Sequence, residues 1–169
     1  ANWDKFLKII KILKHFGCLE DLELTDIGKS VGSLRTENEL WVGLVLISGY
    51  LDNLNPPDLG AVIQSICVEA RRPDLWCNFK PSRKVFDTFD ELEGLKKLIL
   101  TKQNKFLIDT PVILEKESIG IISEWANGRQ WKDIIFNTSL DEGDVVRVVR
   151  RTIDLLSQIQ YCSGVSNRL

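Results

Sequence analysis

The sequence contains a single histidine, His15, and its four cysteines lie far apart, without a Cys-x-x-Cys pair. These absences exclude the common zinc-binding spacings and leave no local cysteine–histidine catalytic signature. The patterns Gly-x-x-x-x-Gly-Lys-[Ser/Thr], Asp-Glu-x-His, Gly-x-Ser-x-Gly and His-Glu-x-x-His are absent as well. No known phosphate-binding loop, ATP-hydrolysis motif, nucleophile elbow or zinc-protease motif is therefore present. We expect no catalytic residue, no metal site and no cofactor in this chain.

Long apolar runs and an excess of positive charge are also missing. The longest apolar stretch, residues 40–51, is interrupted by Gly43, Ser48 and Gly49 and falls short of the ~20 residues that a membrane span needs. The net charge is -2 and the sequence pI is about 5.5. Any contact with nucleic acid must therefore come from a local patch, because a protein that coats nucleic acid by itself carries an overall basic surface.

The cysteines lie in apolar contexts, which favours small buried thiols and a reducing, intracellular compartment. They are Cys18, Cys67, Cys77 and Cys162. Disulfides between distant cysteines stay open at this point. The helical pattern is already under way at Trp3, as expected for a fragment of a longer polypeptide.

Apolar residues recur at helical spacing along most of the chain, and no sustained two-residue alternation indicates a sheet. The fold class is therefore all-α, a bundle of seven or eight helices. The expected helices cover about 3–16, 37–50, 58–71, 86–106, 116–126, 131–136 and 139–162. The helix over 86–106 is expected to face inward with Phe89, Leu92, Leu95, Leu98, Ile99 and Phe106.

Local signals mark where these helices begin and end. Thr36 with Glu39 fits a capping box, and Ser139 with Glu142 repeats it before the last helix. Pro73 is expected to end the helix over 58–71. The helix over 37–50 is apolar almost all round, which places it at the centre of the bundle.

The last helix carries the most informative pattern in the chain. Its polar residues form one stripe, whereas valine, isoleucine and leucine fill the rest of its surface, so we expect it to be buried except along the stripe. The stripe consists of Asp144, Arg147, Arg150, Arg151, Asp154 and Gln158. Arginine suits planar binding of phosphate or carboxylate. The alternative is a solvated surface with internal ion pairs, because Asp154 lies three and four residues after Arg151 and Arg150.

Four segments in register resemble the C-terminal helical (DSHCT) domain of Ski-type DExH-box RNA helicases. They are 24–29 (LTDIGK), 36–41 (TENELW), 124–128 (EWANG) and 142–159, which contains EGDVVR and ends in LLSQI. The last segment is most similar to the bacterial and plant chloroplast branch of that family. The resemblance divides the chain into the end of a winged-helix-like unit at 1–35 and a helical bundle at 36–169 that ends in a long ratchet-type helix.

The resemblance implies a function as well as a fold. The domain would close the RNA channel and contact single-stranded RNA, assisting unwinding in RNA processing or decay, with a chloroplast location. Its partners would be single-stranded RNA, the upstream motor domains of the same polypeptide and other RNA-processing proteins, with no membrane. ATP and Mg²⁺ would bind the motor domains. The counterparts of Arg147, Arg151 and Asp154 face RNA. Arg150, as a flank or an ion-pair partner, and Gln158 complete the expected RNA-binding set.

Two further residues are possible RNA contacts. Trp125 could stack on a base, although aromatic residues at helical spacing are more often part of a core, and Arg129 follows at the next turn. The basic and aromatic stretch 71–84 either lines the RNA channel or forms a solvated loop, and the loop is favoured. A different class of protein also fits the pattern, namely a non-catalytic helical module whose arginine stripe docks on an acidic protein surface.

Overall fold

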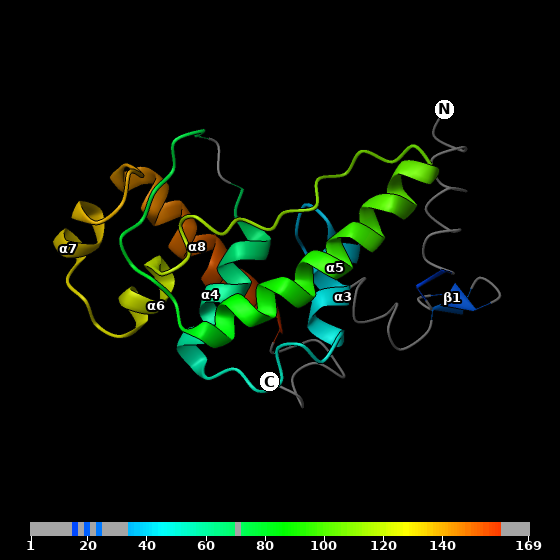
Figure 1. Ribbon diagram of the computed structural model, residues 1–169, viewed down its shortest axis with the longest axis horizontal. Helices are drawn as coiled ribbons and strands as arrows, with labels where there is room; N and C mark the ends of the chain where they lie inside the picture. Colours follow the sequence, from blue (N-terminus) through cyan, green and yellow to red (C-terminus); the bar gives the residue numbers. More distant parts are fainter. Residues whose placement is uncertain (1–14, 17–18, 21–22, 25–33, 70–71, 160–169) are drawn as a thin grey trace.

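The computed structural model describes residues 15–16, 19–20, 23–24, 34–69 and 72–159 of the 169-residue chain. Figure 1 shows a helical molecule, which confirms the predicted all-α bundle. The described residues contain six helices: α3 (Glu39–Ile47), α4 (Pro56–Cys67), α5 (Arg83–Lys105), α6 (Ile121–Ala126), α7 (Trp131–Phe136) and α8 (Glu142–Ile159). None of them is long and apolar enough to cross a membrane.

Upstream of α3 the structure describes a short antiparallel hairpin. Its strands are β1 (Leu19–Glu20) and β2 (Glu23–Leu24), and Leu19 lies opposite Leu24. Nearly all of the expected first helix over 3–16 lies outside the described residues. The total of seven or eight helices, the winged-helix-like unit and the division at residue 35 therefore remain predictions.

Helix α3 lies in the core, as its apolar composition predicted, and six consecutive residues from Trp41 to Leu46 are buried. Its N-cap is Asn38, whose Oδ1 accepts a hydrogen bond from the Trp41 backbone N–H at 3.0 Å. The predicted capping box of Thr36 and Glu39 is therefore wrong. Asparagine is an equally good cap, and it fixes the start of the helix two residues later than expected.

Helix α4 begins two residues earlier than predicted and ends sooner. Asn55 caps it by accepting from the Asp58 N–H at 3.0 Å, and Pro56 opens the first turn. The helix ends at Cys67 rather than near Pro73. The reason is that Val68 leaves the helix in an extended conformation and is buried in a hydrophobic cluster with residues of α6, α7 and α8.

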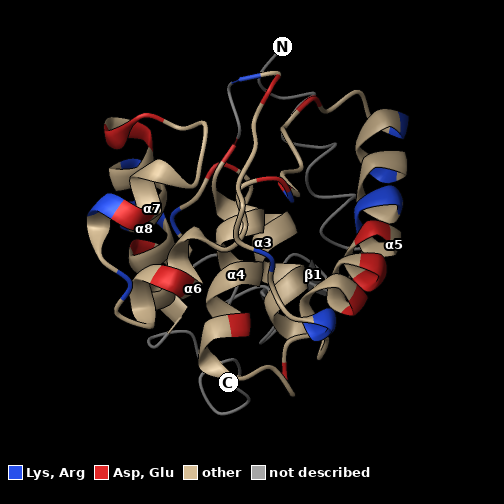
Figure 2. Ribbon diagram, turned by 60° about the vertical axis from the view of Figure 1, so that its left-hand side comes forward, with Lys and Arg blue, Asp and Glu red and all other residues tan. Residues whose placement is uncertain are grey.

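Helix α5 has 23 residues and is about 34 Å long. Phe89, Leu92 and Ile99 are buried as predicted, whereas Leu98 is 45% exposed, which corrects its expected inward position. Leu98 lies about 100° around the helix from Ile99 and so falls off the packed face. In Figure 2, positive and negative residues both occur along α5 and around α7 and α8, so neither sign dominates this view.

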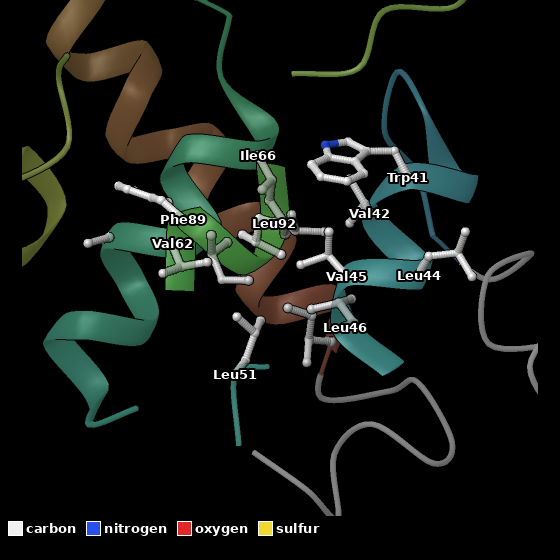
Figure 3. Packing of buried hydrophobic residues seen from close by; sticks show 14 of the residues in the cluster. Trp41, Val42, Leu44, Val45, Leu46, Leu51, Val62, Ile66, Phe89 and Leu92 are labelled. Carbon is white, nitrogen blue, oxygen red and sulfur yellow. The ribbon is translucent and has the colours of Figure 1, made fainter. Parts of the chain in front are cut away.

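Two hydrophobic clusters fill the bundle. The first joins α3, α4 and α5 with the C-terminal part of α8, and Figure 3 shows Trp41, Ile66 and Leu92 converging there from three helices. The second cluster joins α6, α7 and the first half of α8. Cys67, at the end of α4, packs against both clusters. Helix α4 therefore connects the two halves of the bundle.

Residues 108–120 form an extended segment, which we call the strap, between α5 and α6. In Figure 1 it runs back from the C-terminal end of α5 to α6. Four of its carbonyl groups accept hydrogen bonds from side chains of or beside the helices: Gln103 to Thr110 (2.8 Å), Asn38 to Pro111 (3.1 Å), Trp41 to Ile113 (2.7 Å) and Gln64 to Ser118 (2.7 Å). These bonds satisfy backbone that contributes to no helix or sheet.

The strap also explains why α6 is shorter than predicted. A helix was expected from about residue 116, but α6 begins at Ile121, after Gly120 at a φ of 147°. That glycine approaches Phe79 so closely that a Cβ would lie 2.6 Å from the Phe79 Cβ. No side chain of its own caps α6; instead Gln64 accepts from the Ile122 N–H at 3.1 Å. Helix α7 has the predicted bounds.

Candidate nucleic-acid interface

Helix α8 begins at Glu142, three residues later than predicted. Asp141 forms the cap, because its Oδ1 accepts from the Asp144 N–H at 2.8 Å. The predicted capping role of Ser139 is wrong, since its hydroxyl accepts from the Trp76 N–H at 2.8 Å. Residues 160–162, at the expected end of the helix, lie outside the described residues.

One face of α8 packs into the bundle through Val145, Val148, Val149, Thr152, Leu155 and Ile159. The expectation that all of its apolar residues are buried is wrong for Val146 and Ile153, which are each 38% exposed. With Arg150 between them, these two residues share the outward face at i, i+4 and i+7 spacing. The stripe is therefore bordered by exposed apolar surface rather than by solvated charge alone.

Arg147 is half-buried beside the chain that follows α4. It lines a hollow of about 20 Å³ together with Glu69, Arg72 and Asp144. Its Nε is buried and has no hydrogen-bond partner among the described residues. Arg72, in the stretch predicted to be a solvated loop, is exposed and pairs with Asp141 at 2.9 Å and with Asp144 at 3.5 Å. Those carboxylates are thereby engaged, and Arg147 keeps an unused donor.

Arg151 lies on a larger groove, with a volume of about 340 Å³, between α8 and the segment before α3. The groove is lined by Arg35, Thr36, Glu37, Cys67, Arg151, Asp154, Leu155 and Gln158. The Arg151 Nη1 lies 4.0 Å from the Glu37 Oε1, and both side chains are 40% or more exposed. An ion pair at this distance and exposure contributes little, so Arg151 remains available to a ligand.

Asp154 and Gln158 form a pair one helical turn apart. The Gln158 Nε2 donates to the Asp154 Oδ2 at 3.0 Å. Within the described part of the chain, Asp154 has no ion pair with Arg150 or Arg151, and Arg150 is exposed without an ion pair. The alternative of a helix covered by internal ion pairs is therefore not what the described residues show.

Gln158 is engaged with the main chain of Arg35. Its Oε1 accepts from the Arg35 N–H at 2.6 Å, and its Nε2 donates to the Arg35 carbonyl at 3.2 Å. Arg35 and Glu37 were not predicted as site residues. No local pattern marks them, because they reach the groove only through the packing of their segment against α8.

The two remaining candidates lie at the other end of the bundle. Trp125 is 43% exposed at the end of α6. The Arg129 Nε donates to Glu124 at 2.6 Å, and its guanidinium lies 5.0 Å from the centre of the Phe79 ring. Glu124 raises the pKa of Arg129. Neither Trp125 nor Arg129 lines the groove or the small hollow beside α8.

The described residues offer little chemistry beyond binding. Among them, no group of three or more histidine, cysteine, aspartate or glutamate residues could hold a metal ion. Burial raises the pKa of the Cys67 thiol to about 12 and raises that of Cys77 as well. Such thiols are poor nucleophiles.

Fold and surface together define a helical domain that presents a charged helix beside a groove. Residues 21–169 match the DSHCT (NUC185) domain family. The DExH-box ATP-dependent RNA helicase DExH15 chloroplastic from Arabidopsis thaliana is 32% identical over 165 residues, which cover 94% of this chain and 14% of that protein. The uncharacterized helicase C17H9.02 from Schizosaccharomyces pombe is 23% identical over 161 residues, 92% of this chain and 15% of that protein.

These matches cover nearly the whole chain, and they confirm the family that the sequence segments had indicated. The chain belongs to the DSHCT (NUC185) domain family. It spans only 14% and 15% of the length of the two relatives.

Proposed function

We propose that this chain is the C-terminal domain of an ATP-dependent RNA helicase, that it closes the RNA channel, and that α8 contacts single-stranded RNA. The family match and the two helicase relatives support the first part. The observation that carries the proposed RNA contact is that the arginines of α8 have few bonding partners. Arg147 is half-buried and has no ion pair among the described residues, Arg150 is exposed and likewise has none there, and Arg151 has only a weak one.

Three arginines along one side of a helix suit a strand that moves. Guanidinium groups bond phosphate oxygens whatever the base sequence, and they also stack on bases. ATP and Mg²⁺ would bind the upstream motor domains, which would be the domain's partners in the same polypeptide. A chloroplast location is part of the proposal, supported by the name of the Arabidopsis relative.

A protein-docking function is the second candidate, and the exposed apolar residues favour it. Val146 and Ile153 are each 38% exposed beside Arg150, which would suit a motor domain or another RNA-processing protein as the partner. The two functions differ in their response to salt. RNA binding through phosphates weakens with salt, with a slope of about -0.7 per contacted phosphate on a logarithmic scale.

The test is fluorescence anisotropy of labelled single-stranded RNA with this chain at several salt concentrations. Arg147→Glu/Arg151→Glu should abolish the salt-dependent binding. The matched control is Arg83→Glu/Lys97→Glu, which makes the same change in net charge at two exposed positions on α5. Circular dichroism checks that both variants keep their helices. Equal loss in both variants would show only a net-charge effect and would reject the stripe as the RNA site.

A further inference from the structure

A side chain of α8, that of Gln158, holds the backbone of the segment before α3. The Gln158 amide accepts from the backbone N–H of Arg35 and donates to its carbonyl, at 2.6 and 3.2 Å. An amide has the same donor and acceptor as a peptide group, so it can engage both backbone groups of a residue. The neighbouring Leu34 is only 4% exposed and belongs to the first core cluster. The backbone at residue 35 is therefore held from two directions.

This attachment gives the groove a second arginine. Arg35 and Arg151 both line the groove, one from the segment before α3 and one from α8. Arg151 and Gln158 are seven residues apart, so they lie on the same side of α8, two turns apart. Gln158, which holds the Arg35 backbone, therefore lies on the same face of α8 as Arg151, which supplies the other cation.

We propose that one phosphodiester group of a bound RNA strand lies in this groove between Arg35 and Arg151, and that Gln158 is the positioning residue for Arg35. This inference rests on the proposed function, and it specifies which chemical group of the RNA binds in the groove. Arg35 and Arg151 line the groove from two different segments, and a guanidinium group from each can bond a non-bridging phosphate oxygen, as arginine does in planar phosphate recognition. The groove volume of about 340 Å³ leaves room for such a group.

Glu37 acts as an internal competitor in the same groove. Its Oε1 lies 4.0 Å from the Arg151 Nη1, and a phosphate oxygen of the bound strand would take the place of this carboxylate oxygen. The pair is weak and solvated, so a phosphate displaces it at small cost. Removing the charge at residue 37 should therefore strengthen RNA binding, an effect opposite in sign to the loss of an RNA contact.

The experiment measures the affinity of labelled single-stranded RNA for this chain and its variants. Arg35→Ala should weaken binding about three- to fivefold and reduce the salt slope by about 0.7, the value for one phosphate contact. Arg35→Lys, which keeps the charge, should retain most of the affinity. Glu37→Gln should bind about two- to threefold more tightly. Arg83→Ala, an exposed arginine on α5 outside the groove, is the control and should bind as the unchanged chain does.

Gln158→Met tests the positioning residue, because methionine has a similar length and makes none of the amide's three hydrogen bonds, two to the Arg35 backbone and one to Asp154. It should weaken binding as Arg35→Ala does, and the double variant should be no weaker than Arg35→Ala alone, since Gln158 acts through Arg35. Urea denaturation run beside it separates this effect from a loss of stability. A purely structural role predicts additive losses and no change in the salt slope.

The outcomes separate this inference from the function on which it rests. If Arg35→Ala and Glu37→Gln bind like the unchanged chain while Arg147→Glu/Arg151→Glu loses binding, the groove site is refuted and the stripe stands. If the unchanged chain does not bind even in the range of about 10⁻⁶ to 10⁻⁴ M expected for non-specific contacts, both proposals fail.

Discussion

Gln64 offers the sharpest test of how the two halves of the bundle are joined. It lies in the middle of α4 and is 1% exposed. Its Nε2 donates to the Ser118 carbonyl at 2.7 Å, and its Oε1 accepts from the Ile122 N–H at 3.1 Å. One side chain thus fixes the end of the strap and caps the first turn of α6. The informative change is Gln64→Leu, which keeps the volume and removes both bonds.

The expected cost follows from the groups that lose their partners. The Ser118 carbonyl and the Ile122 N–H belong to residues that are 2% and 4% exposed, so neither reaches water easily. Each unsatisfied buried group costs about 1–3 kcal/mol, or about 4 kcal/mol together at mid-range. Burying the apolar leucine offsets about 1 kcal/mol of this. The free energy of unfolding should therefore fall by about 3 kcal/mol.

Urea denaturation followed by circular dichroism measures this change. With an m-value of about 2 kcal/mol/M, the midpoint should fall by about 1.5 M, and the melting temperature by about 6–12 °C. Gln130→Leu is the control, because that glutamine is exposed and its side chain makes no cap bond, so its effect should stay within about 0.5 kcal/mol. A loss below 1 kcal/mol for Gln64→Leu would refute the reasoning, since the two buried groups would then have found other partners.

Three further predictions follow from single sites. In a variant whose other cysteines are changed to serine, Cys67 should react with a thiol reagent at about pH 8 far more slowly than a free thiol does. The reason is that its pKa of about 12 leaves only about one thiolate in ten thousand molecules. A reaction rate like that of glutathione would contradict this. Lys116 donates to Glu93 at 2.6 Å and lowers the Glu93 pKa below its ordinary 4.5, so this pair stabilises the fold at neutral pH and stops doing so as the pH falls through that lowered pKa. The difference in unfolding free energy between the unchanged chain and Glu93→Gln should be about 0.2–1 kcal/mol at pH 7 and should vanish once the pH is below that lowered pKa; a constant difference would exclude the pair as its cause. Gly120→Ala should cost about 2–4 kcal/mol in urea denaturation because of its positive φ and its closeness to Phe79, and a neutral effect would show that the strap can shift.

Much of the helical core could be predicted from the sequence, because helical periodicity reports which side of a segment is buried. The all-round apolar composition of α3 placed it in the core, and Trp131–Phe136 was predicted with its observed bounds. Helix starts were harder. Thr36 and Asn38 are both good caps, and only the packing of the neighbouring segment decides between them.

The stripe on α8 was visible in the sequence, but the groove beside it was not. Periodicity indicates that Arg151 and Gln158 share a side of the helix, yet it cannot indicate which distant segment lies against them. Arg35 is 123 residues from Gln158 in the sequence. For the same reason the exposure of Val146 and Ile153 was missed, because the number of helices that pack around α8 is a property of the whole bundle.

The strap has a consequence for how this domain can change over time. The helices recognise it at four places through carbonyl groups, which every amino acid possesses. Substitutions at Thr110, Ile113 or Ser118 therefore leave these bonds in place, whereas the side chains that donate to the carbonyl groups cannot be exchanged so freely. Sequence drift should be tolerated more readily at Thr110 and Ile113, which are only partly buried, than at Asn38, Trp41, Gln64 and Gln103. A saturation mutagenesis library selected for folding would reveal this asymmetry. The residues whose carbonyl groups accept the bonds should tolerate many amino acids, and the residues whose side chains donate should tolerate few.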